Sequence, residues 1–127
     1  MIPDAEFTRI RDRLLHNSVQ EEEGGCRSWL GKAHQGQYGK THIRIRDDNG
    51  LLVINTTITC HRAIFMATNK VLLDNSDNDV SHLCHNARCI NINHLFLEHH
   101  TINMSRIQCK NDGECHGHPA PSPNCML

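Results

Sequence analysis

Cysteine and histidine are concentrated in the second half of this 127-residue chain, at spacings suited to binding a metal. Cys84, Cys89 and His94 follow one another with four residues between each pair. Zinc favours thiolate and imidazole ligands in a tetrahedral arrangement, and closely spaced residues of one loop commonly supply them. The segment therefore predicts a zinc site that takes its fourth ligand from elsewhere in the chain.

The fourth ligand is either Cys26 or Cys60, the two cysteines that lie outside the C-terminal half of the sequence. We favour Cys26, because Gly24 and Gly25 precede it and glycine permits a close approach of the backbone. Cys60 begins an apparent helix, and we expect it to be a buried free thiol.

A second cluster lies in the C-terminal tail, where Cys109, Cys115 and Cys125 surround two histidines. Either His116 or His118 could complete a Cys3His site, and the spacing from Cys115 favours His118. The tail has no apolar pattern that could fold unaided, so metal binding would explain its order. Both sites would be closed by four protein ligands, and we therefore expect two structural zinc ions.

His82 and Asn103 are candidates for hydrolytic chemistry. His82 lies two residues before Cys84, so zinc would fix its position, and a neutral imidazole can act as a general base near neutral pH. Asn103 lies 21 residues downstream, in a short predicted helix between the two zinc sites. Its amide oxygen suits a hard cation such as Mg²⁺. A structural histidine and a helix-capping asparagine are the competing interpretation.

A strongly patterned hairpin is predicted upstream of these residues. Residues 39–47 alternate, with His42, Arg44 and Arg46 on one face and isoleucines on the other. The sequence DDNG at 47–50 is a turn signal, and the β-branched run 51–58 fits the returning strand. The pattern indicates a hairpin with one cationic face. Such a ribbon could enter the major groove of DNA, or the face could simply be solvated.

The remaining pattern predicts two helices and a modest core. Apolar residues at helical spacing indicate an amphipathic helix over residues 4–20, and residues 60–69 read as a short helix. The length favours one domain. Aromatic residues make up 4% of the chain and the mean hydropathy is −0.51. Because the apolar supply is thin, we expect metal binding to contribute much of the stability.

Cysteine usage and charge limit the classes of protein to which the chain could belong. An odd count of seven cysteines, an N-terminus without an apolar leader and the lack of any long apolar run favour an intracellular protein, cytoplasmic or nuclear, over a secreted or membrane-spanning one. The net charge is −1, but residues 27–70 carry seven lysines and arginines against two acids. This basic middle is compatible with one face contacting a phosphate backbone.

The run SHLCHNARC at 81–89, continued by Asn91, His94, Leu95, Asn103, Arg106 and Cys109, resembles the His-Cys box homing endonucleases. These belong to the wider ββα-metal, HNH or His-Me finger group of nucleases. Looser similarity at Cys26, Trp29, Tyr38-Gly39 and His61-Arg62 extends the resemblance over about residues 26–125. It implies an α+β, zinc-stapled ββα-metal fold with a basic β-hairpin and short helices. Residues 1–25 would form an N-terminal amphipathic helix, and 26–127 the zinc-binding nuclease domain.

The resemblance also implies a function, namely metal-dependent hydrolysis of DNA to 5′-phosphate and 3′-hydroxyl ends, of the site-specific homing type. In that family the histidine matching His82 activates water, and the asparagine matching Asn103 binds a single catalytic Mg²⁺. The expected partner is double-stranded DNA, bound by a possible homodimer. Residues expected to contact the DNA are His42, Arg44, Arg46 and Arg106. A zinc-stabilised DNA-binding module without catalysis is the alternative.

Overall fold

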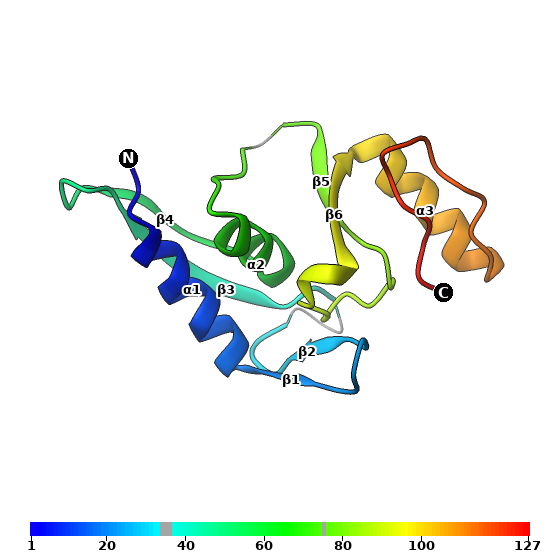
Figure 1. Cartoon of the computed structure of the whole chain (residues 1–127), viewed down its shortest axis with the longest axis horizontal. Helices are drawn as coiled ribbons and strands as arrows, with labels where there is room; N and C mark the ends of the chain where they lie inside the picture. Colours follow the sequence, from blue (N-terminus) through cyan, green and yellow to red (C-terminus); the bar gives the residue numbers. More distant parts are fainter. Residues whose placement is uncertain (34–36, 75) are drawn as a thin grey trace.

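A computed structural model describes residues 1–33, 37–74 and 76–127, which fold into a small α+β structure (Figure 1). The described strands pair as the antiparallel sheets β1–β2, β3–β4 and β5–β6, which confirms the predicted fold class. The elements in chain order are α1 (Asp4–His16), β1 (Ser18–Gln20), β2 (Arg27–Trp29), β3 (Lys40–Arg46), β4 (Leu52–Thr59), α2 (Cys60–Asn69), β5 (Asn78–His82), η1 (Ile92–His94), β6 (Leu95–His99) and α3 (His100–Asp112).

The N-terminal helix is shorter than the apolar pattern predicts. The pattern extends to residue 20, but α1 ends at His16. The Asn17 side chain donates a hydrogen bond to the Arg13 carbonyl and so satisfies one of the free acceptors at the helix end. The chain then turns into β1, where Ser18 pairs with Trp29 of β2. Pairing with a distant strand therefore overrides the helical pattern after residue 16.

The main core lies between α1, α2 and one face of the β3–β4 hairpin, which extend together toward one end of the molecule (Figure 1). Ile43 and Ile45 of β3 point into this core, while the residues that alternate with them, His42, Arg44 and Arg46, are exposed. Burying an apolar side chain of this size contributes about 1.5–3 kcal/mol. The core residues contributed by the two helices are Phe7, Ile10, Leu14, Cys60, Ala63, Ile64, Met66 and Ala67.

The β3–β4 hairpin forms as the sequence predicts. His42 pairs with Thr57 and Arg44 with Asn55, so the cationic face lies opposite the core. In the turn, the Asp47 carboxylate accepts hydrogen bonds from the Asn49 and Leu51 backbone amides. Gly50 has a φ of +82°, the left-handed region that glycine enters without strain. These local interactions fix the register of the hairpin.

The second unit is the β5–β6 hairpin followed directly by α3, at the other end of the molecule (Figure 1). His82 is the last residue of β5 and pairs with Leu95, the first residue of β6. At its N-terminus α3 is capped by His99, whose side chain accepts from the Thr101 amide. The C-terminal tail folds back along α3. A strand pair and a helix thus hold the two residues with catalytic potential, as the ββα prediction requires.

Residues 1–25 pack on the rest of the chain. α1 contacts α2, and β1 pairs with β2, so the predicted division at residue 25 falls in the loop between two paired strands. Within the described ranges, no helix combines the length and the apolar character needed to cross a membrane.

Candidate active site and metal centres

The first metal cluster gathers four side chains from three segments of the chain. Cys26, Cys84, Cys89 and His94 place one ligand atom each within 4.8 Å of all the others. The Cys26 and Cys84 sulfurs lie 3.6 Å apart, and the His94 Nδ1 lies 3.6 Å from the Cys89 sulfur. A tetrahedral zinc ion would place two sulfurs about 3.8 Å apart, and a sulfur and a nitrogen about 3.6 Å apart. The donor set therefore fits zinc in both type and spacing.

The structure also separates the two candidates for the fourth ligand. Cys26 lies in the cluster, whereas Cys60 is buried in the core at the start of α2. Burial raises the pKa of Cys60 to about 12, so this residue is a neutral thiol. The His94 Nε2 donates to the Gly24 carbonyl at 3.0 Å, which orients the ring so that Nδ1 faces the sulfurs.

The second cluster orders the C-terminal tail against α3. It consists of Cys109, Cys115, His118 and Cys125, again with ligand atoms within 4.8 Å of one another. The His118 Nε2 lies 3.7 Å from the Cys109 sulfur and 3.5 Å from the Cys125 sulfur. The His116 ring instead bonds to the Asp112 carboxylate outside the cluster. The structure therefore selects His118 over His116.

A cavity of about 200 Å³ brings His82 and Asn103 together. The two residues are 21 positions apart in the sequence and come from the end of β5 and the first half of α3. The other residues that line the cavity are Gln37, Tyr38, Val80, His85, Ala87, Met104, Arg106, Ile107 and Lys110. An imidazole, an amide and a nearby lysine thus converge on one partly open space, the usual setting of an active site.

The position of the His82 ring is fixed through one nitrogen. Its Nε2 lies 2.9 Å from the backbone carbonyl of Cys89, a member of the first cluster. A carbonyl oxygen only accepts, so Nε2 carries the proton and Nδ1 keeps its lone pair. Within the described residues no hydrogen bond occupies Nδ1. Burial lowers the pKa of His82, against the smaller opposing effect of the bond to Cys89, and favours the neutral ring.

A stack of three rings supports His82, and the sequence did not reveal it. The His61 ring lies 4.5 Å from the His82 ring and 4.8 Å from the Tyr38 ring, measured between centroids. Burial lowers the pKa of His61 to about 2, so His61 stays neutral beside His82. Tyr38 lies just before β3, and His61 is the second residue of α2. The stack therefore joins the open end of the β3–β4 hairpin to His82. The sequence resembles the homing-endonuclease family at Tyr38 and His61, but it does not indicate what either residue does.

The expectation that Arg106 contacts DNA is corrected by the structure. Arg106 is only 1% exposed, and its guanidinium makes two hydrogen bonds with the Glu98 carboxylate, at 2.6 and 2.8 Å. The Glu98 carboxylate also accepts from the Ser81 hydroxyl. Burial raises the pKa of Glu98, but the bonds from Arg106 and Ser81 outweigh it and hold that pKa below its ordinary value. Arg106 also donates to the Pro123 carbonyl and the Cys125 sulfur, so it ties β6 to the second metal cluster.

Replacing Arg106 by methionine is expected to lower the free energy of unfolding by about 3–5 kcal/mol, because it leaves the buried Glu98 carboxylate without its partner. Denaturant unfolding at saturating zinc measures the change. The double variant Arg106→Met with Glu98→Met is the control, since it removes both charges and should recover most of the loss. Equal stability of the single and double variants would contradict a paired role for Arg106.

The cationic face of the hairpin is open to solvent. Arg44 and Arg46 are exposed on β3, and Arg46 also donates to the Gly50 carbonyl in the turn. The His42 ring lies across the sheet surface, with Nε2 2.6 Å from the Asn55 side-chain oxygen and Nδ1 3.2 Å from the Thr57 hydroxyl. The face therefore presents hydrogen-bond donors and acceptors together with positive charge.

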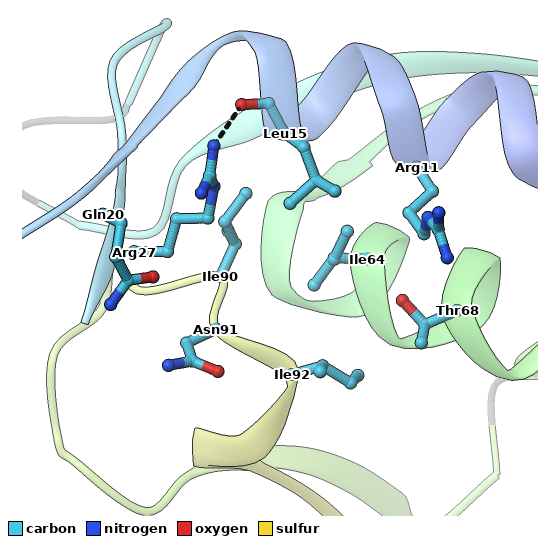
Figure 2. Close-up of a pocket in the computed structure, with 9 residues that line it drawn as sticks. All are labelled: Arg11, Leu15, Gln20, Arg27, Ile64, Thr68, Ile90, Asn91 and Ile92. Carbon is cyan, nitrogen blue, oxygen red and sulfur yellow. Dashed lines mark hydrogen bonds between the residues drawn. The ribbon is translucent and has the colours of Figure 1, made fainter. Parts of the chain in front are cut away.

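A second cavity, of about 190 Å³, has a different character (Figure 2). It lies between α1, α2 and the segment before η1, where Leu15, Ile64 and Ile90 contribute apolar walls. Arg27 donates to the Leu15 carbonyl at its edge. None of its nine lining residues is a carboxylate, thiol or imidazole. This space therefore offers no side chain suited to act as a general base near neutral pH, whereas the cavity at His82 does, and that cavity is the candidate active site.

One of three comparisons with known proteins identifies a family for most of the chain. Searches of curated proteins and of solved structures each returned no match. A scan against protein families matched residues 26–125 to the zinc-binding loop region of homing endonuclease. The matched range contains both metal clusters and the cavity at His82. Because the match spans most of the sequence, the chain belongs to the family defined by the zinc-binding loop region of homing endonucleases.

Proposed function

We propose that the chain is a metal-dependent DNA endonuclease with His82 as general base and Asn103 as ligand of one Mg²⁺. Membership of a homing-endonuclease family indicates a role in cutting or binding DNA. The observation that carries the catalytic proposal is the shared cavity, onto which His82 presents a free Nδ1 and Asn103 an amide. A module that only binds DNA would have no need of this pair.

His82 would act on the water that attacks the phosphorus. The Cys89 carbonyl holds the proton on Nε2, so Nδ1 can take a proton from water as its oxygen bonds to phosphorus. The bond from phosphorus to the 3′ oxygen then breaks, its electron pair stays on that oxygen, and a proton from solvent water completes the 3′-hydroxyl opposite the new 5′-phosphate. The ring need not rotate or change tautomer, because the bond to the Cys89 carbonyl and the contact with the tilted His61 ring hold it in place.

Asn103 has the chemistry to hold the Mg²⁺. Its amide oxygen is a hard ligand, it is half-buried, and it lines a cavity with room for the waters that Mg²⁺ keeps. When bound, the ion supplies positive charge that stabilises negative charge developing on the phosphate and the leaving oxygen. The zinc clusters flank this site, and their closed ligand sets suit a structural task.

The hairpin face is the proposed DNA-binding surface. His42, Arg44 and Arg46 project from the side of β3 that faces solvent, and the stack of Tyr38, His61 and His82 links its open end to the cavity. A two-stranded ribbon fits the major groove and can read base edges there. We therefore propose site-specific, homing-type cleavage, with residues 26–127 as the nuclease domain and residues 1–25, which contain α1 and β1, as an N-terminal segment. Cutting both strands would follow from a homodimer.

The proposal is tested by incubating supercoiled plasmids that carry diverse inserts with the zinc-loaded chain. We expect nicked or linear products with Mg²⁺ and none when Ca²⁺ replaces it, since Ca²⁺ supports binding but is a poorer catalytic ion. Ligation of the products by a DNA ligase, without prior end treatment, reports 5′-phosphate and 3′-hydroxyl ends. Specific retention of a duplex without cleavage in any metal would favour the non-catalytic DNA-binding module instead.

A further inference from the structure

Asp79 bridges two side chains of α3. The carboxylate lies on β5, three residues before His82, and its Oδ2 accepts from the Asn103 Nδ2 at 3.0 Å. The same oxygen lies 2.6 Å from the His100 Nδ1. No other carboxylate is bonded to Asn103 within the described residues. Strand β5 therefore ends in the proposed general base, His82, and through Asp79 also holds the proposed metal ligand, Asn103.

This contact decides which way the Asn103 amide faces. A carboxylate only accepts hydrogen bonds, so the NH2 group must face Asp79 and the amide oxygen must face away from it. Asn103 itself lines the cavity shared with His82, whereas Asp79 is not among the residues that line it. We propose that Asp79 is a positioning residue, which orients the Asn103 amide so that its oxygen is presented to the catalytic metal; this inference rests on the proposed function.

The bond would also make the oxygen a better ligand. Donation of an N–H to an anion polarises the amide and increases the negative charge on its oxygen. The Asp79 charge also lies at the N-terminus of α3, the positive end of the helix dipole, where an anion is favourable. The first turn of α3 has no acidic residue of its own, so β5 supplies that charge.

Without Asp79, the amide could face the cavity with either its NH2 group or its oxygen. Only one of the two orientations offers a metal ligand. Groups that orient a metal ligand in this way commonly change metal affinity by about 10- to 100-fold when they are removed. Asp79 is partly exposed and its partner His100 is more so, hence its loss should leave the fold intact.

The test compares Asp79→Ala, Asp77→Ala and Asn103→Ala with the native full-length chain, all loaded with zinc. Asp77→Ala is the matched control, because it removes the same charge two residues away while its side chain is exposed. Binding of Mn²⁺, the probe for the magnesium site, is measured by the electron paramagnetic resonance of the free ion. The side-chain amide of Asn103 is followed in parallel by ¹⁵N NMR without Mn²⁺.

We expect Asp79→Ala to weaken Mn²⁺ binding by about 10- to 100-fold and to shift the Asn103 amide resonance, whereas Asp77→Ala changes binding less than about twofold. If Asn103→Ala loses the ion but Asp79→Ala binds it like the native chain, the role of Asp79 is overturned and the metal site stands. If Asn103→Ala binds Mn²⁺ like the native chain, the metal site of the proposed function is itself wrong, and the role of Asp79 fails with it.

Discussion

Replacing His82 by alanine is expected to slow plasmid cleavage by about 10²- to 10⁴-fold, the usual contribution of a positioned general base. The reason is geometric, since Nδ1 of His82 is the free imidazole nitrogen that the Cys89 carbonyl leaves available beside Asn103. Single-turnover rates at saturating Mg²⁺ measure the loss. Binding of an uncut duplex in Ca²⁺ should stay within a few-fold of native, because the hairpin face is untouched.

Two histidine controls make this result specific. His16→Ala changes an exposed residue at the end of α1 that does not line the cavity, and should cut at the native rate. His85→Ala removes a second imidazole that lines the cavity, whose Nε2 is buried without a hydrogen-bond partner among the described residues. If His85→Ala abolished cleavage while His82→Ala cut normally, the general base would have to be reassigned to His85.

Replacing Cys89 by serine is expected to abolish cooperative folding. Cys89 is fully buried, and its sulfur faces the His94 Nδ1 in the first cluster. Structural zinc sites contribute roughly 10–16 kcal/mol in small domains, whereas whole domains are stable by only about 5–15 kcal/mol. Loss of one such site would therefore remove the whole free energy of unfolding. The measurements are the thermal transition by circular dichroism and the zinc content of the purified chain.

The matched control for this experiment is Cys60→Ala. Cys60 is equally buried, but it lies in the hydrophobic core at the start of α2 and outside both clusters. This variant should therefore keep two zinc ions and a cooperative transition. A Cys89→Ser chain that retained two zinc ions and melted like the native one would refute the first metal site. Loss of zinc from the Cys60→Ala variant would instead indicate that Cys60 is a zinc ligand.

Local patterns predicted most of the elements. The alternation of His42, Ile43 and Arg44 and the turn at Asp47 and Gly50 each depend on neighbours in the chain, and the hairpin forms where they indicate. Residues 60–69 likewise form α2 over the range that the sequence predicts. The predicted end of α1 was wrong by several residues. The helix ends where it does because Ser18 pairs with a strand eleven residues further along the chain.

The candidate site was predictable where residue type alone is diagnostic. Thiolates and imidazoles at ligand spacing identify zinc sites, and the clusters contain the predicted residues. Arg106 shows the limit of such reasoning. The sequence does not distinguish a surface arginine from a buried one, and only the contact of Arg106 with Glu98 of the neighbouring strand does so. The ring contact between His61 and His82 and the bond from Asn103 to Asp79 likewise join residues whose pairing no local pattern encodes.

The hairpin divides its residues between two independent tasks, and this bears on evolvability. Ile43 and Ile45 are buried and hold the sheet to the helices, whereas His42, Arg44, Asn55 and Thr57 point only outward. Substitutions at such exposed positions usually change stability by less than about 0.5 kcal/mol. The surface proposed to meet DNA can therefore drift or be randomised in a library, and acquire new preferences, while the scaffold beneath it stays the same.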